Sequence, residues 1–115
     1  MARESSERWL CSHLVELVAD GGDRQPETVV LEEIAEEEAV AAVEQPLRQG
    51  SGVMIRATGL AAHAMVTQCL RRENDFQLEM RFDGGFRWSP EVWRPDHLYR
   101  PRPQARQAKG AASTD

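Results

Sequence analysis

Residues 76–82, FQLEMRF, alternate strictly between apolar and polar side chains. Successive side chains of a β-strand point to opposite faces, so this pattern puts all four apolar side chains on one face. Those residues are Phe76, Leu78, Met80 and Phe82. A strand with one apolar face needs partner strands and a core to cover it. The pattern therefore predicts a sheet with one buried face.

Three other segments have strand character. They are rich in branched side chains and are bounded by turn-forming residues. The segments are CSHLVELV at 11–18, TVVL at 28–31 and VMIRA at 53–57. Gly-Gly-Asp at 21–23 and PLRQGSG at 46–52 supply the connections between them. The chain thus favours a series of short strands over a helical bundle.

The segment LAAHAMVTQCLRR at 60–72 is ambiguous, because its alanines also suit a helix. Met65, Thr67 and Cys69 alternate with the residues between them, and this alternation favours a strand. RENDF at 72–76 then provides a hairpin turn into the strand at 76–82. We expect residues 60–72 to form a strand.

The segment LEEIAEEEAVAAVEQPL at 31–47 is the main uncertainty in the fold. Alanine and glutamate are strong helix formers, and Pro46 would end a helix. However, Ile34, Val40 and Val43 give only a thin apolar stripe, and a short Ala-rich helix is marginal without packing. Taken alone, residues 32–45 favour a helix over two strands joined by a turn.

The stretch FRWSPEVWRPDHL at 86–98 predicts a short helix over residues 90–94. Ser89 is a suitable N-cap, and Pro90 suits the first helical position. Pro95 ends the helix, since the residue before a proline disfavours helical geometry. Trp88 and Trp93 are expected to pack on the core.

Length and charge exclude several classes of protein. The 115 residues suit one domain, and no apolar run approaches the roughly 20 residues of a membrane-spanning helix. Residues 1–99 carry ten arginines against eighteen carboxylates, which argues against nucleic-acid binding. Residues 100–115 are basic, lack large apolar side chains and are predicted to be a disordered tail. The two cysteines and the lack of a secretion signal predict a cytoplasmic protein with reduced thiols.

No pattern for metal binding or catalysis is present. His13, His63 and His97 lack the spacing of metal ligands, and the glutamate run lacks the Asp-x-Asp-x-Asp-Gly pattern of a calcium loop. Neither a Gly-x-Ser-x-Gly elbow nor a phosphate-binding loop occurs. We expect no enzyme activity, no metal and no cofactor.

Taken in order, these features resemble the PilZ domain family. The resemblance covers roughly residues 3–99. It rests on the strand order, on VVLEEIAEEEAVAAVEQPLRQGSGVMI, on the hairpin AAHAMVTQCLRRENDFQLEMRF and on the closing FRWSPEVWRPDHL. PilZ domains are small bacterial β-barrels best known as receptors for cyclic di-GMP. The resemblance therefore implies an all-β, six-stranded barrel with a short C-terminal helix, and a strand–turn–strand over residues 32–45.

The resemblance also implies where a ligand would bind. Family members that bind cyclic di-GMP carry Arg-x-x-x-Arg before the first strand, whose guanidinium groups hold the phosphates. In this chain Arg3 and Arg8 are five residues apart instead of four, and Glu4 stands where the first arginine would align with Arg8. The first signature is therefore degenerate.

The second family signature is Asp/Asn-x-Ser-x-x-Gly after the second strand, and it falls on residues 33–38. Glu33 stands for the acidic residue, Ala35 for the serine and Glu38 for the glycine. Ala35 has no hydroxyl to donate, and Glu38 adopts positive φ less readily than glycine. Each uncompensated glutamate charge near a ligand phosphate costs about 4 kcal/mol at 4 Å.

The sequence thus predicts a non-enzymatic regulatory or adaptor module of bacterial second-messenger signalling that does not bind cyclic di-GMP tightly and whose partner is a protein. The alternative is a receptor for cyclic di-GMP or another nucleotide with an unorthodox arginine site. That site would use Arg3, Arg8, Arg48 or the pair Arg71 and Arg72.

Overall fold

The computed structural model describes residues 7–22 and 24–100, and these residues form six strands. The strands are β1 (Trp9–Ala19), β2 (Glu27–Ile34), β3 (Glu38–Val43), β4 (Gly52–Ala57), β5 (Leu60–Arg71) and β6 (Phe76–Phe82). Every strand predicted from the sequence is present, with ends that differ by a few residues.

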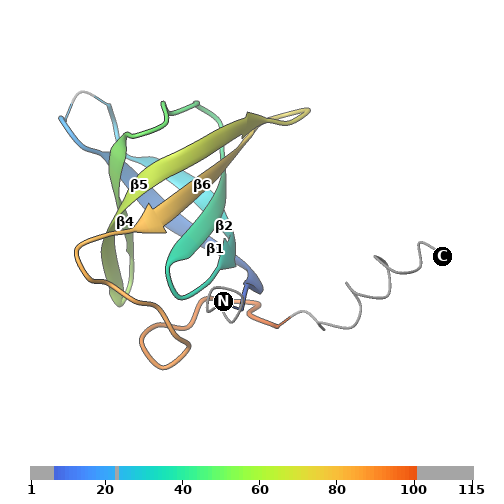
Figure 1. Ribbon diagram of the computed structural model, residues 1–115. Helices are drawn as coiled ribbons and strands as arrows, with labels where there is room; N and C mark the ends of the chain where they lie inside the picture. The colour runs from blue at the N-terminus through green and yellow to red at the C-terminus, as the bar shows by residue number, and fades with distance from the viewer. Residues whose placement is uncertain (1–6, 23, 101–115) are drawn as a thin grey trace, which may run out of the picture.

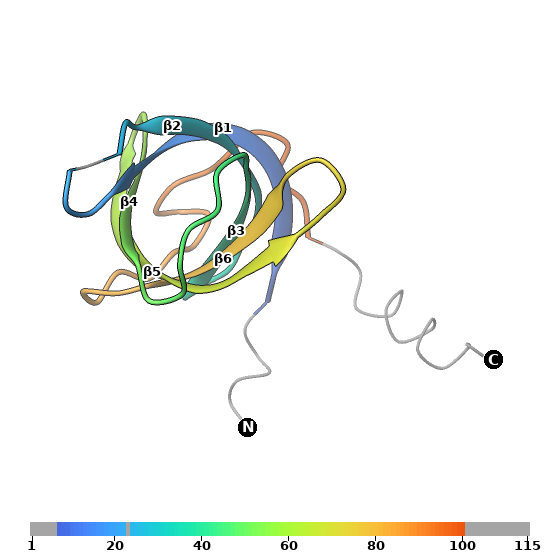
Figure 2. The same ribbon diagram turned by 90° about the horizontal axis from the view of Figure 1, so that it is seen from above.

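The six strands close into one antiparallel barrel in the order β1-β2-β3-β6-β5-β4 (Figures 1 and 2). Pairing of β1 with β4 closes the barrel, and pairing of β3 with β6 joins its two halves. Closure removes the unpaired edges that an open sheet would present to another chain. The all-β, six-stranded fold is confirmed.

The core fills the barrel interior and contains both large and small side chains. Ile34, Ile55, Leu78 and Met80 are each no more than 1% exposed. A barrel of six strands is narrow, so small side chains must face large ones for all strands to fit. The small ones are alanines on two strands: Ala39 and Ala41 on β3, and Ala62 and Ala64 on β5.

The helix alternative for residues 32–45 is wrong. The segment contains the end of β2, a turn and β3, as the family resemblance implies. Ala39 and Ala41 of β3 face the barrel interior, where their small size matters more than their helix propensity. Ala39 pairs with Met80, and Ala41 pairs with Leu78 on β6.

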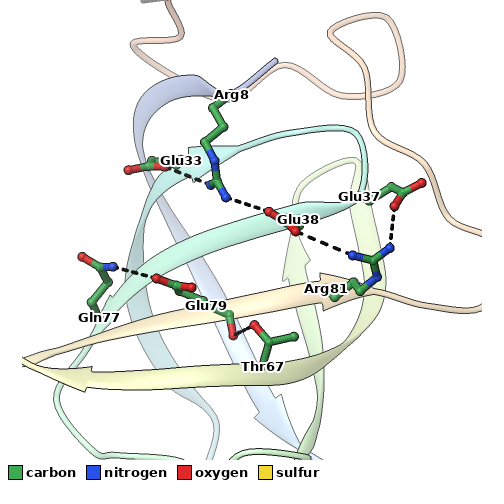
Figure 3. Close-up of polar contacts among 8 residues, drawn as sticks. All are labelled: Arg8, Glu33, Glu37, Glu38, Thr67, Gln77, Glu79 and Arg81. Atoms are coloured by element: carbon green, nitrogen blue, oxygen red, sulfur yellow. Dashed lines mark hydrogen bonds and ion pairs between the residues drawn. The ribbon is translucent and has the colours of Figure 1, made fainter. Parts of the chain in front are cut away.

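Residues 60–71 form a strand as predicted, but not with the predicted alternation. A β-bulge lies between Val66 and Gln68 in the pairing with β6, so one extra residue separates the two halves of β5. Thr67 occupies the bulge, and its hydroxyl donates to the carbonyl oxygen of Glu79 at 3.1 Å (Figure 3). As a result Cys69 packs against the core on the same side as Val66.

The short helix predicted for residues 90–94 is not formed. The N–H groups of Val92 and Trp93 donate to the carbonyl oxygen of Ser89 at 2.9 and 3.2 Å, which makes a single turn. Beyond it the backbone pairs with β1 instead: Ser12 N–H donates to the carbonyl oxygen of Asp96 at 3.1 Å. Too few residues separate Ser89 from Pro95 for a helix to compete with these tertiary contacts.

The segment after β6, residues 83–100, crosses one end of the barrel (Figure 1). Trp88 and Trp93 are buried there, and the indole N–H of Trp88 donates to the carbonyl oxygen of Trp93 at 2.7 Å. The indole N–H of Trp93 donates to Thr58 O at 3.0 Å. The predicted packing of both tryptophans on the core is confirmed.

Two predictions fall largely or wholly outside the residues that the structure describes. They concern Arg3 and the tail at 100–115, of which only Arg100 is described. Over residues 7–22 and 24–100 no helix has the length and hydrophobicity needed to cross a membrane.

Candidate functional site

The structure brings three of the predicted site residues into direct contact. Arg8 precedes β1, Glu33 lies near the end of β2, and Glu38 begins β3. Nη1 of Arg8 lies 3.1 Å from Oε1 of Glu33, and Nη2 lies 2.7 Å from Oε1 of Glu38 (Figure 3). Arg8 of the first signature and Glu33 and Glu38 of the second therefore lie side by side and form ion pairs with each other.

The ion pairs continue along the rim of the barrel. Arg81 on β6 lies 3.6 Å from Glu38 and 2.8 Å from Glu37, and Arg87 also pairs with Glu37. The hydrogen bond that Arg87 donates to the carboxylate of Glu37 raises the pKa of Arg87. We call these six residues the Arg8 network: Arg8, Glu33, Glu37, Glu38, Arg81 and Arg87. Exposed pairs of this kind are each worth about 0–1 kcal/mol, so their main effect is on what can bind there.

The network corrects the expectation of a bare acidic loop. Glu33, Glu37 and Glu38 are each paired with an arginine, so their charges are compensated. The repulsion of about 4 kcal/mol per charge, expected for an uncompensated glutamate, is therefore reduced. The two carboxylates paired with Arg8 still compete with any anionic ligand, because the ligand must displace them to reach the guanidinium.

Ala35 is held in the β2–β3 turn and is 2% exposed. Its N–H donates to the carbonyl oxygen of Glu38 at 2.8 Å, which closes the turn. Among the described residues other than glycine, His97 alone has positive φ, so Glu38 is not in the conformation that would favour glycine. The turn has adapted to glutamate without backbone strain at this position.

Trp9 follows Arg8 in the sequence, but its ring is already in contact with other side chains instead of open for stacking on a base. The ring of Trp9 meets Trp88 edge-on at 6.0 Å between centroids, and the guanidinium carbon of Arg100 lies 5.3 Å from the Trp9 ring centre. The nearby depression of about 220 Å³ is also lined by Glu7 and Glu36. Two carboxylates make it unfavourable for a phosphate.

A cluster that the sequence did not indicate joins His63 on β5 to Asp20, which follows β1, and Asp83, which follows β6. Nε2 of His63 is 2.9 and 3.1 Å from the two carboxylate oxygens of Asp20, and Nδ1 is 2.9 and 3.0 Å from those of Asp83. Carboxylates accept hydrogen bonds, so both ring nitrogens donate to them when the imidazole is protonated. Hydrogen bonds to Asp20 and then Asp83 raise the pKa of His63 above its ordinary value of 6.5.

Gly52 makes this cluster possible. Asp20 and His63 lie on either side of β4, and a Cβ at Gly52 would be 2.2 Å from Oδ2 of Asp20 and 3.1 Å from Cε1 of His63. Because Gly52 has no side chain, the ring of His63 and the carboxylate of Asp20 can meet above it. No local sequence pattern marks these residues, because they are far apart in the chain and meet only through strand pairing.

We expect the contribution of His63 to stability to depend on pH. Because its pKa is raised in the folded state, the stabilisation is fully present below the unfolded value of about 6.5 and is lost as pH rises through the folded pKa. His63→Gln should therefore reduce the difference in urea midpoint between pH 6 and pH 8.5, relative to the natural chain. His97→Asn, at an exposed position of positive φ that asparagine tolerates, should leave that difference unchanged. An unaltered difference in the His63 variant would contradict the assignment.

The described residues offer little for catalysis. Burial, followed by the charges of Glu33 and Glu32, raises the pKa of Cys11 to about 12, so its thiol stays protonated at neutral pH. Both ring nitrogens of His63 are occupied by carboxylates, which leaves neither free to accept a proton. Over residues 7–22 and 24–100 no group of three or more His, Cys, Asp or Glu side chains is arranged to hold a metal ion.

Arginines named for the alternative nucleotide site are partly occupied as well. Arg72 is bonded to both Glu32 and Asp75, and Arg71 lies 5.8 Å from the ring centre of Phe76. Arg48 has no carboxylate partner among the described residues.

Comparison of the chain with protein-family models, with curated proteins and with solved structures gave no match.

Proposed function

We propose that the protein is a non-enzymatic regulatory or adaptor module of bacterial second-messenger signalling that does not bind cyclic di-GMP tightly. The closed six-stranded barrel supports this proposal, because it is the fold implied by the resemblance to PilZ domains. We place the protein in the cytoplasm, consistent with the free thiols of Cys11 and Cys69. Its partner in this proposal is a protein.

The observation that carries the proposal is the pairing of Arg8 with Glu33 and Glu38. By the family resemblance, Arg8 is the described residue that would hold a phosphate of cyclic di-GMP, and Glu33 and Glu38 stand at positions of the family's second signature. A phosphate must break both ion pairs before Arg8 can bind it in the bidentate way that arginine favours. The absence of a serine hydroxyl at Ala35 and the competition from Glu33 and Glu38 for Arg8 both lower the affinity for cyclic di-GMP.

Titration calorimetry with cyclic di-GMP tests the proposal. We expect no dissociation constant below about 1 μM, which corresponds to roughly 8 kcal/mol of binding free energy. A tighter complex would overturn the proposal and favour the alternative, a receptor for cyclic di-GMP or another nucleotide.

Two variants would locate any binding that is measured. Arg8→Gln removes the guanidinium at the rim, whereas Arg94→Gln removes an exposed arginine that has no carboxylate partner among the described residues. Loss of affinity in the Arg8 variant alone would place the ligand at the Arg8 network. Equal affinity in both variants would exclude Arg8 from the binding site.

A further inference from the structure

A concavity of about 450 Å³ lies between the β1–β2 and β3–β4 connections. Pro46 and Leu47 contribute apolar surface to it, while Arg24 and Arg48 contribute guanidinium groups. These connections lie at the opposite end of the barrel from residues 83–100 (Figure 1). The concavity is therefore separate from the Arg8 network, which lies at the start of β1.

The two arginines of this concavity differ from most others in the protein. In the described part of the chain six arginines form ion pairs with carboxylates: Arg8, Arg56, Arg72, Arg81, Arg87 and Arg100. Arg24 and Arg48 are not among them, although carboxylates outnumber arginines in the protein. Two guanidinium groups without carboxylate partners among the described residues thus line one hollow.

Hydrogen bonds fix the side chain of Arg24 and the backbone of Arg48. Nη1 of Arg24 donates to the carbonyl oxygen of Pro46 at 3.1 Å, which ties the β1–β2 connection to the β3–β4 connection. The hydroxyl and the N–H of Ser51 both donate to the carbonyl oxygen of Arg48, at 2.6 and 3.0 Å. Among the described residues, no other acceptor bonds the guanidinium of Arg24 and none bonds that of Arg48, so their N–H groups can donate to a ligand.

Asp20 also lines the concavity, and its charge would oppose an anion. Both of its carboxylate oxygens, however, lie within 3.1 Å of Nε2 of His63. When protonated, the imidazole, which Asp20 shares with Asp83, partly compensates the charge of Asp20, and its hydrogen bonds draw the Asp20 carboxylate across Gly52. The one carboxylate among the described residues that line the concavity is thereby occupied.

We propose that this concavity, the Arg24–Arg48 site, binds a small organic phosphate monoester, and that His63 is a positioning residue that keeps Asp20 from opposing it. The forked guanidinium groups match the oxygens of a phosphate, and Pro46 and Leu47 provide apolar surface for the organic part. The volume lies within the range of small-molecule pockets, about 300–1,000 Å³. This inference does not depend on the proposed function.

Nuclear magnetic resonance titration with phenyl phosphate at pH 6.5 and low salt tests the site. We expect saturable shifts of the backbone amides of residues 47–52, and weaker binding of inorganic phosphate, which lacks the apolar group. Arg24→Gln and Arg48→Gln should each weaken phenyl phosphate binding about tenfold, as expected for the loss of a charged hydrogen-bond donor. Arg94→Gln is the matched control and should bind like the natural chain.

A rescue experiment tests the role of His63. His63→Gln should weaken phenyl phosphate binding, because it exposes the charge of Asp20 to the ligand. Adding Asp20→Asn to that variant should restore the affinity, a result that a purely structural role for His63 would not produce. Absence of saturable shifts, or equal affinity in the Arg24, Arg48 and Arg94 variants, would overturn the site. Failure of the rescue would overturn the positioning role of His63.

Discussion

Replacing Trp88 with alanine is expected to lower the free energy of unfolding by about 3–5 kcal/mol. The side chain is 3% exposed, and its indole packs edge-on against Trp9. Its indole N–H also donates to the carbonyl oxygen of Trp93, so the truncation leaves both a cavity and an unpaired acceptor. Urea unfolding followed by far-ultraviolet circular dichroism, which does not rely on tryptophan fluorescence, measures the loss.

Val92→Ala is the control for this prediction. Val92 belongs to the same turn but is 52% exposed, so its truncation should change stability by no more than about 0.5 kcal/mol. If Trp88→Ala cost less than about 1 kcal/mol, residues 83–100 would not unfold together with the barrel. The contrast thus tests whether the C-terminal segment is a structural part of the domain.

Ala41→Leu is expected to destabilise the protein by about 1–3 kcal/mol, with a larger loss if the strands must separate. Ala41 is fully buried and faces the barrel interior between Leu31 on β2 and Leu78 on β6. The narrow interior has no space for three more carbon atoms at this position. The same urea unfolding experiment measures the effect.

The neighbouring residue provides a matched control. Ala42 is only partly buried and points away from the core, so Ala42→Leu should change stability by no more than about 0.5 kcal/mol. Similar losses in the two variants would contradict the strand geometry, in which adjacent side chains point to opposite faces. The pair therefore tests directly why β3 is rich in alanine.

Several parts of the fold could be predicted from local patterns. The strict alternation at 76–82 is β6, and its apolar residues Leu78, Met80 and Phe82 are buried. Trp88 and Trp93 were predicted to be core residues, and they are. These predictions succeeded because side-chain periodicity and the burial of large aromatic groups are properties of short segments.

The predictions at 32–45 and at 90–94 show where local patterns fail. Both segments have helix-favouring residues, and neither forms a helix. At β3 the barrel requires small inward side chains, so alanine reflects the available space. After Ser89 the backbone groups find partners on β1, at Leu10 and Ser12, and these contacts replace the hydrogen bonds of a helix.

In the candidate sites, too, some features could be predicted from the sequence and others depended on the fold. Arg8, Glu33 and Glu38 were recognisable from the family resemblance, but their mutual ion pairs were not, since they depend on where β1, β2 and β3 begin and end. The contact of His63 with Asp20 had no signal at all, because it requires the pairing of β4 with both neighbours and a glycine at residue 52.

The sequence by itself determined five of the six strands, the apolar face of β6 and the acidic charge of residues 1–99, because each of these depends on residue type and short-range spacing. The tertiary structure alone decided which charges meet. Closure of the barrel brings Arg8 onto two glutamates and Asp20 onto His63, and leaves Arg24 and Arg48 without carboxylate partners among the described residues. Charge pairing acts over a few ångströms between residues distant in sequence, so only the folded chain establishes it.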